Sequence, residues 1–451
     1  MKKLLQARLY HLYKLGGSVQ NSARKRVTPI GYLVLLAFPC ASSFAVVYAR
    51  ASLIQMMSVF GAVLVIAFFL TWLRNSRIRI SRDLPRLASV GEDLVYTVHY
   101  ENLRSGKLAN FLLEELPPDP SPSKELFLGS TEPGEEQRNA FDRTFIAYRW
   151  MWLVKQRIFF DSKATVCESV RKGESKHCLM QITPKRRGVI KLSNMRALLP
   201  DPLGVFQRIQ QVEQSTDHLI VLPKRYRVGD LHLSGSSRNQ IGGEALSSIS
   251  GHAGEFVGLR EYRPGDPLRH IHWPSWGKSG KPIVKEYEDV FFPRYGLFLD
   301  TVVSAEKANL FEEGVSLAAS FACAVDTREC LLDLIFMQQG AKVLTVGRGV
   351  AKVENMLETL AGVEIDLKPN WQELEKMILQ HTENLTACIA IFCDWSEDRL
   401  KMVQKWEAAG LSLLLFYVCD DEKLAREQLK GMAKRFKIAP VDKIQQVLYS
   451  L

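Results

Sequence analysis

The chain has no acidic residue before Asp83. Residues 1–82 hold 12 of the 59 Lys and Arg residues, which leaves 47 basic against 49 acidic residues from Asp83 onward, a balance of −2. The net charge of +10 therefore comes from the N-terminal segment. A large phosphate-neutralising face is not favoured in a remainder that is nearly neutral, so we do not expect the chain to bind nucleic acid.

Sequence motifs of several enzyme classes are also missing. The eight cysteines form no C-x-x-C pair, and no Cys or His motif typical of a nucleophilic catalyst occurs. Gly277-Lys278-Ser279 lacks the upstream glycine of a phosphate-binding P-loop. His270 and His272 have no evident third ligand, which disfavours zinc. Because no nucleophile–base pair stands out, we expect a protein that is not an enzyme.

Two long runs contain no charged residue. Pro29 to Tyr48 has 20 residues, Ala51 to Leu73 has 23, and only Ala49 and Arg50 separate them. A helix of about 20 apolar residues crosses the ~30 Å hydrocarbon core of a bilayer. The sequence therefore predicts two transmembrane helices, 29–48 and 51–73, that form a tight helical hairpin. A cleaved signal peptide is disfavoured because a second run follows at once.

Positive charge flanks both outer ends of this pair of runs. Residues 1–28 form a basic segment with seven Lys and Arg residues, and Arg74, Arg77, Arg79 and Arg82 follow the second run. Lys and Arg mark the cytoplasmic side of a membrane. We therefore expect both termini and the soluble domains to be cytoplasmic, where the cysteines stay reduced.

Residues 83–225 contain many short segments with strand-like alternation. Asp93 to Leu103 alternates polar and apolar side chains, and further strands are expected at Phe111 to Leu116, Ser175 to Thr183, Val189 to Leu199, Val205 to Ile209 and Leu219 to Pro223. Short strands at regular spacing indicate a β-sandwich-like domain.

Two segments interrupt this pattern of strands. Pro117 to Pro133 is rich in Pro, Ser and Glu and is interpreted as a loop. Arg143 to Phe160 combines aromatic and basic residues. We interpret it as an insertion packed on the sandwich, with a position at a membrane surface as the alternative.

Strands alternate with helices in residues 293–451. We expect strands that end near Asp300, Met337, Val346, Cys393 and Val418, with helices between them. This alternation predicts an α/β domain with a mostly parallel sheet. Ligands bind beyond the carboxyl ends of the strands in such sheets, and Asp300 and Asp394 are both expected there.

The stretch from Gly254 to Val290 concentrates charged and aromatic residues. Pro264-Gly265-Asp266-Pro267 predicts a turn in its centre. His270 to Trp273 alternates as a strand would, and Ile283 to Phe292 predicts another strand. The expected arrangement is strand, turn, strand, turn, strand.

Asp266 can close the central turn and pair with Arg260, Arg263 or Arg269. A bidentate pair of arginine and carboxylate would make the segment rigid. Arg, Tyr and Trp also dominate the energetics of protein interfaces. The stretch is therefore interpreted as a folding scaffold, a docking surface, or both.

This stretch resembles the signature of the bacterial family called domain of unknown function 58, whose pattern runs roughly G-E-F-x-x-L-R-x-Y-x-x-G-D-x-x-R-x-I-x-W. The matching residues are Gly254, Glu255, Phe256, Leu259, Arg260, Tyr262, Gly265, Asp266, Arg269, Ile271 and Trp273. The Arg-Arg-Gly turn at 186–188 and Asp-Pro-Leu-Gly-Val-Phe at 201–206 match the usual lead-in. We assign residues 226–292 to the signature segment, with these docking candidates: Glu255, Arg260, Tyr262, Gly265, Asp266, Arg269 and Trp273.

The resemblance implies a von Willebrand factor A-like domain at 293–451. That fold holds Mg²⁺ through Asp-x-Ser-x-Ser after its first strand, a later Thr and a later Asp, which are the hard oxygen ligands that Mg²⁺ prefers. Asp300 and Ser304 match the motif, Val302 replaces its middle serine, and Asp394 would be the later Asp. No Thr is identified. The alternative is that Asp300 and Asp394 cap turns or helices at strand ends.

The resemblance further implies a bacterial inner-membrane partner of MoxR-type AAA+ ATPases, often alongside transglutaminase-like membrane proteins. We therefore expect a non-enzymatic, membrane-anchored adaptor or assembly factor, with contacts that can depend on Mg²⁺. The alternatives are a metal-dependent hydrolase centred on Asp300 and Asp394, with His272 as a further candidate, and a purely structural membrane scaffold.

Overall fold

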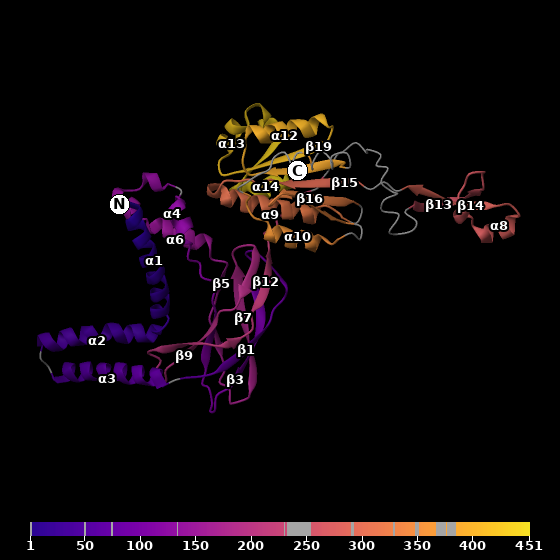
Figure 1. Cartoon of the computed structure of the whole chain (residues 1–451). Helices are drawn as coiled ribbons and strands as arrows, with labels where there is room; N and C mark the ends of the chain where they lie inside the picture. The colour runs from indigo at the N-terminus through magenta and orange to yellow at the C-terminus, as the bar shows by residue number, and fades with distance from the viewer. Residues whose placement is uncertain are drawn as a thin grey trace. The chain divides into compact units, whose positions relative to one another are not determined.

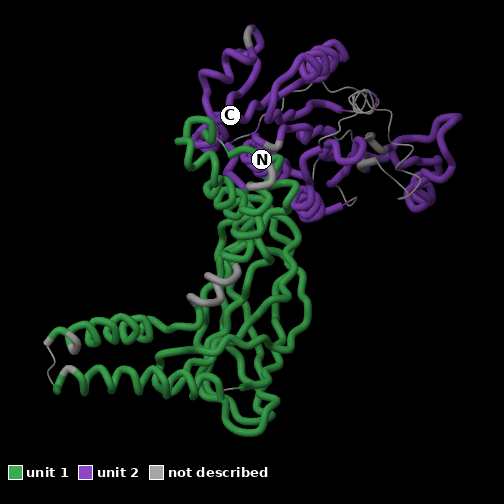
Figure 2. The backbone as a smooth tube through the Cα atoms, turned by 60° about the vertical axis from the view of Figure 1, so that its left-hand side comes forward, with its two compact units in different colours: residues 1–224 green, residues 225–451 purple. Residues whose placement is uncertain are grey.

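The chain divides into two units, residues 1–224 and residues 225–451 (Figure 2). The computed structural model describes residues 2–48, 51–73, 75–132, 134–229, 231, 254–289, 293–327, 330–347, 351–366, 376 and 385–451. Two segments lie largely outside these residues: 228–252, which is rich in Gly and Ser, and 371–381, where the sequence favours a helix.

Three helices begin the first unit: α1 (Lys2–Arg24), α2 (Pro29–Tyr48) and α3 (Ala51–Leu73). α2 and α3 lie side by side and have the bounds of the two predicted runs (Figure 1). Large apolar side chains such as Leu33, Phe44 and Phe68 are exposed on them. By length and composition one helix, Ile54–Leu73 within α3, could cross a membrane or serve as a signal sequence, whereas the apolar part of α2, Pro29–Phe44, is shorter. The second span stays a prediction.

Short strands in three sheets make up most of the remaining first unit. The sheets have the strand orders β11-β1-β3-β7-β5, β10-β9-β4-β6 and β2-β12-β8. The bounds are β1 (Ile78–Asp83), β2 (Leu87–Ser89), β3 (Leu94–Asn102), β4 (Phe111–Glu115), β5 (Phe160–Ser162), β6 (Thr165–Cys167), β7 (Ser175–Pro184), β8 (Gly188–Leu192), β9 (Met195–Pro200), β10 (Gln207–Gln211), β11 (Glu213–Gln214) and β12 (Asp217–Leu222).

One hydrophobic core joins these three sheets. The alternation in β3 buries Tyr96, Val98 and Tyr100, as predicted, and these side chains pack with residues such as Phe111 of β4 and Ile190 of β8. Alternate side chains are buried in β1 and β3, which is the arrangement expected of a sandwich. The single strand predicted at 189–199 is wrong in one respect. Strand β8 ends at Leu192, and the residues that follow form β9 in a different sheet.

A helical insertion lies between β4 and β5, where the sequence suggested a loop and a packed segment. It consists of α4 (Lys124–Gly129), the short 3-10 helix η1 (Glu135–Gln137), α5 (Ala140–Phe145) and α6 (Ala147–Gln156). Its buried side chains Phe127, Ile146 and Leu153 cluster with Leu9 and Tyr10 of α1. The insertion therefore packs on the N-terminal helix through these residues. The predicted packing of 143–160 on the sandwich is confirmed only for its end, where Phe159 and Phe160 join the sandwich core.

Strand β10 and the turn before it are hydrogen-bonded to the segment before α2 and to the C-terminal end of α3. The backbone N–H of Thr28 donates to the Val205 carbonyl at 3.1 Å, and the Gln207 N–H donates to the Arg26 carbonyl at 2.9 Å. At the other end, the Arg208 guanidinium donates to the Trp72 carbonyl at 2.8 Å. The sandwich is thus attached directly to the base of the apolar helices.

Gly31 lies at this attachment and leaves no room for a side chain. A Cβ there would overlap the Val205 carbonyl and lie 2.9 Å from Val27 Cγ1. We expect Gly31→Val to weaken the attachment by about 1–3 kcal/mol, the usual effect of overpacking. Hydrogen exchange of residues 25–28 and 205–208 in the full chain measures this. The control is Gly16→Val in α1, where a Cβ would meet no atom within 4 Å; equal exchange in both variants would contradict the prediction.

The first regular elements of the second unit, within the described residues, form a hairpin, and an α/β domain follows. The bounds are β13 (Gly254–Glu261), η2 (Leu268–His270), α8 (Trp273–Ser279), β14 (Ile283–Asp289), β15 (Arg294–Leu299), η3 (Ala305–Lys307), α9 (Ala308–Ala324), β16 (Leu331–Met337), β17 (Ala341–Val346), α10 (Val353–Gly362), β18 (Ala387–Phe392), α12 (Glu397–Ala408), β19 (Ser412–Cys419), α13 (Glu422–Leu429), η4 (Lys430–Arg435), β20 (Phe436–Pro440), η5 (Val441–Lys443) and α14 (Ile444–Tyr449).

A six-stranded sheet forms the centre of the α/β domain, with strand order β17-β16-β15-β18-β19-β20. Every neighbouring pair is parallel except β16–β17. Helices α12 and α13 cover one face and α9 and α10 the other (Figure 1). The direction of strand succession reverses between β15 and β18, and this switch point is where such sheets bind ligands.

Candidate functional site

The signature stretch folds into an antiparallel hairpin with a helical tip. Strands β13 and β14 pair along their length, with a shift in register between Phe256 and Gly258. Ile271 of the tip bridges Val284 of β14, and these two side chains are buried. The hairpin therefore has a small apolar centre of its own, and a two-stranded hairpin of this kind is marginally stable by itself.

The predicted strand at His270 to Trp273 is wrong, because two prolines direct this segment into helical turns. η2 follows Pro267, and α8 begins at Trp273 with Pro274 in its first turn, where proline is favoured. His272 precedes α8, and its Nδ1 lies 2.7 Å from the Ser275 hydroxyl. Gly280, with a φ of 70°, ends α8 in the left-handed conformation that suits glycine.

A bidentate ion pair closes the central turn, which confirms one of the three predicted pairings. The Arg260 guanidinium donates to the two Asp266 carboxylate oxygens at 2.7 and 2.8 Å. The Arg263 backbone N–H also donates to Asp266, at 2.8 Å. Gly265, with a φ of 108°, supplies the backbone conformation that this turn requires. The Arg260 guanidinium lowers the pKa of Asp266 to about 2.

The lowered pKa fixes the pH range in which this ion pair supports the hairpin. An unperturbed aspartate has a pKa of about 3.9. Since the folded pKa is depressed to about 2, the stabilisation is present above about pH 4 and is lost as the pH falls through about 2. We expect carboxyl-carbon NMR to give an Asp266 midpoint near 2. A midpoint near 4 would contradict the ion pair, and Arg260→Ala supplies that reference.

The tip of the hairpin exposes large apolar side chains beside positive charge. Trp273 is 65% exposed and stacks on Trp276 at a ring separation of 5.2 Å, and Leu268 is 69% exposed. Arg263 and Arg269 are exposed as well, whereas Tyr262 is half-buried. The side chain of Glu255 lies outside the described residues. Exposed Trp and Arg side chains have the composition of an interface hot spot.

The second candidate site lies at the carboxyl edge of the six-stranded sheet. Asp300 follows β15 and Asp394 lies just beyond β18, so adjacent strands bring both carboxylates to the same edge, as predicted. Asp300 is 1% exposed and accepts from Arg399 Nε of α12 at 2.8 Å. The Val302 N–H donates to its other oxygen at 3.1 Å. Burial raises the pKa of Asp300, and Arg399 opposes that shift.

Cationic side chains partner both carboxylates. Lys307 Nζ donates to Asp394 at 2.6 Å, and the Trp395 backbone N–H donates to the same oxygen at 2.9 Å. Arg399 also donates to the carbonyl of Val302, the residue that replaces the middle serine of the magnesium motif. Ser304 contributes a backbone carbonyl that accepts from the Lys307 N–H at 3.0 Å.

These residues do not fit a magnesium site. Magnesium requires several oxygen ligands in near-octahedral geometry, and a guanidinium and an ammonium repel it. Among the described residues, no group of three His, Cys, Asp or Glu side chains is placed to hold a metal ion. The predicted metal role of Asp300, Ser304 and Asp394 gains no support from the geometry, which gives both carboxylates a structural role. Sequence reasoning missed Arg399 and Lys307, which belong to no motif.

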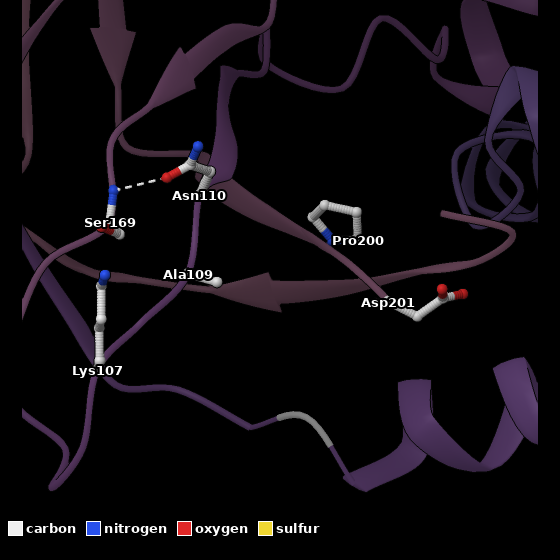
Figure 3. A pocket seen from close by; sticks show the side chains of 6 residues that line it. All are labelled: Lys107, Ala109, Asn110, Ser169, Pro200 and Asp201. Carbon is white, nitrogen blue, oxygen red and sulfur yellow. Dashed lines mark hydrogen bonds between the residues drawn. The ribbon is translucent and has the colours of Figure 1, made fainter. Parts of the chain in front are cut away.

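A hollow of about 470 Å³ lies elsewhere, in the first unit, lined by Lys107, Ala109, Asn110, Ser169, Pro200 and Asp201 (Figure 3). The Asp201 carboxylate accepts from the backbone N–H groups of Leu203 and Phe206, both at 2.6 Å. The Asn110 side chain accepts from the Ser169 N–H at 2.9 Å. Asp201 therefore closes the Asp-Pro-Leu-Gly-Val-Phe turn.

Comparisons with known proteins give no family assignment. No protein-family model and no curated protein matches the chain. Similar solved structures include proximal thread matrix protein 1 from the mussel byssus (10% identity, 35% of this chain and 46% of that chain, TM-score 0.26). They also include a CARDB domain with di-metal ions from Pyrococcus furiosus (12%, 33% and 92%, TM-score 0.17) and a β-glucosidase from Listeria innocua (11%, 32% and 16%, TM-score 0.15). The chain spans less than half of the mussel protein, and matches at these TM-scores carry no functional argument.

Proposed function

We propose that this chain is a non-enzymatic, membrane-anchored adaptor that acts with a MoxR-type AAA+ ATPase through protein–protein contacts. The observation that carries the proposal is the signature hairpin, which locks Arg260 to Asp266 and leaves Trp273 and Leu268 exposed. A tryptophan side chain has only two rotatable side-chain bonds, so it loses little conformational entropy when a partner binds it. The hairpin is therefore the docking element in this proposal.

The strand order of the α/β domain supports the von Willebrand factor A-like part of the proposal. Its central strand β15 has neighbours β16 and β18, and the switch point lies between β15 and β18. In this chain Arg399 and Lys307 supply the positive charge at that edge. We therefore propose that partner binding does not require Mg²⁺.

In the proposed topology, α2 and α3 both cross the bacterial inner membrane. Basic residues flank both outer ends of the pair, and the base of the pair is bonded to β10. Lys and Arg favour the cytoplasmic side, so both termini and the soluble domains are cytoplasmic in this proposal. A transglutaminase-like membrane protein is a further partner that the family resemblance suggests.

The alternative functions rest on weaker observations. A hydrolase centred on Asp300 and Asp394 would need a free carboxylate or a metal, and both carboxylates are already paired with cations. A purely structural scaffold would not explain why the hairpin exposes Trp273 and Leu268. The adaptor function is compatible with the paired carboxylates and gives the exposed Trp273 and Leu268 a role.

Co-purification tests the proposal. The full chain in lipid nanodiscs is incubated with the MoxR-type ATPase of the same genome, with Mg²⁺ or with EDTA, using an ATP analogue that binds in either condition. We expect equal capture in both. Empty nanodiscs serve as the control. Absence of capture in both conditions would contradict the adaptor function, and capture only with Mg²⁺ would contradict the metal-independent mode.

A further inference from the structure

We propose that α1 and the helices α5 and α6 packed beside it form a lipid-binding surface for the anionic headgroups next to the membrane-spanning segment. The inference rests on the membrane anchoring in the proposed function, and it adds a second, peripheral contact with the same bilayer.

The direction of α1 places it along a membrane surface. α1 ends at Arg24 and α2 begins at Pro29, where the apolar run starts. α1 runs across the direction of α2 and α3 in both views of the chain (Figure 1, Figure 2). When α2 follows the bilayer normal, α1 therefore extends along the interface, the orientation of an interfacial amphipathic helix.

α1 has a buried face and an exposed face that combines apolar and basic residues. Leu9 and Tyr10 are each 6% exposed, and the Tyr10 hydroxyl donates to the Pro122 carbonyl at 3.0 Å. Arg8, Leu12 and Leu15 are exposed. Their spacing of four and three residues places them on one side of a helix. Leu12 and Leu15 are 64% and 66% exposed, so this side presents two leucines beside a guanidinium.

The insertion adds aromatic residues next to α1. Phe141 is 68% exposed and its ring lies 4.5 Å from that of Phe145, which is 40% exposed. Met151 of α6 is 53% exposed. The Tyr13 hydroxyl donates to the Phe145 carbonyl at 2.7 Å, so α1 holds α5 directly. Exposed Phe, Leu and Met beside Lys and Arg are typical of surfaces that enter the headgroup region.

The charge of this region favours an anionic leaflet as the occupant. Residues 1–28 have seven basic and no acidic residues. In the insertion, Glu132 pairs with Arg138 at 2.9 Å and Glu135 pairs with Arg149. Residues 124–156 hold five basic and five acidic residues, so the insertion itself is neutral and the positive charge is that of residues 1–28. Basic segments beside a membrane span are attracted to anionic lipids over about a Debye length.

Depth-dependent quenching in nanodiscs tests this inference in the full chain. A fluorescent label is placed at Leu12→Cys or Phe141→Cys after the two exposed cysteines are replaced (Cys40→Ser, Cys323→Ser). The control label is at Leu179→Cys on β7, a leucine that is 61% exposed on the sandwich. The nanodiscs contain brominated phosphatidylcholine with or without phosphatidylglycerol.

We expect at least twofold stronger quenching at positions 12 and 141 than at 179 in discs with phosphatidylglycerol. Arg8→Glu with Lys14→Glu should reduce it to the control level, as should high salt. Quenching equal to that at 179 would overturn the inference, and so would quenching that ignores phosphatidylglycerol or appears only when the ATPase is added. Insertion of α2 and α3 is scored separately by co-elution of the chain with the discs. ATPase capture is scored on the same samples. Failure of the adaptor function can therefore be distinguished from failure of lipid binding by α1.

Discussion

Arg399→Met is expected to destabilise the second unit by about 3–5 kcal/mol, because it leaves Asp300 buried without its cation. Every 1.4 kcal/mol is a factor of ten in an equilibrium constant, so amide exchange in β15 and β18 should accelerate by about 10²- to 4 × 10³-fold. Hydrogen exchange of the full chain, followed by mass spectrometry, resolves these strands from the rest of the molecule.

The loss in Arg399→Met should also depend on pH. Burial raises the pKa of Asp300, and removal of Arg399 removes the main opposing influence, so the pKa rises further. An acid with a raised folded pKa is tolerated when protonated, so stability is present at low pH and is lost as the pH rises through the folded pKa. The difference in the free energy of unfolding between Arg399→Met and the unmodified chain should therefore shrink on acidification.

Two variants control for the loss of an arginine as such. Arg435→Met removes an exposed ion pair with Glu407 and should change stability by less than about 1 kcal/mol. Asp300→Asn combined with Arg399→Met removes the buried charge and should recover part of the loss. An Arg399→Met effect as small as that of Arg435→Met would contradict the structural role assigned to the Asp300–Arg399 pair.

Trp273→Ala is expected to weaken ATPase binding by about 2 kcal/mol or more, roughly 30-fold, since tryptophan is enriched among interface hot spots. The side chain is 65% exposed, so the fold should persist in the variant. Titration of the ATPase against the full chain in nanodiscs measures the dissociation constant.

A matched control separates docking from a general loss of apolar surface. Leu179→Ala removes an apolar side chain that is 61% exposed on the sandwich and should leave the dissociation constant unchanged. Arg260→Ala should weaken binding through the turn itself, because it removes the partner of Asp266. Unchanged affinity in both Trp273→Ala and Arg260→Ala would remove the hairpin from the interface.

Much of the secondary structure could be predicted from the sequence where one pattern dominates. The uncharged runs gave the bounds of α2 and α3, and the apolar segments Leu331–Met337 and Ala341–Val346 gave β16 and β17. Alternation also predicted β3. In each case, burial of a face or of a whole segment determines the pattern, so local residue types carry the information.

Other parts depend on contacts between residues distant in sequence. The His270 to Trp273 alternation favoured a strand, but Pro267 and Pro274 favour helical turns there. Strand β20 is short, and its residues show no clear alternation. It is a strand because it pairs with β19. The Asp300–Arg399 pair joins residues 99 positions apart, which no local motif records. The Asp266–Arg260 pair could be predicted because the two residues are six positions apart.

Photo-crosslinking from the hairpin tip tests the central claim most directly. A photoreactive phenylalanine replaces Trp273 in the full chain, expressed in the membrane of the source cells, and replaces Leu179 in a control chain. The adaptor function predicts a crosslink from position 273 to a MoxR-type AAA+ ATPase, identified by mass spectrometry, and none to it from position 179. Crosslinks to the ATPase from neither position, or equally from both, would contradict docking through the hairpin.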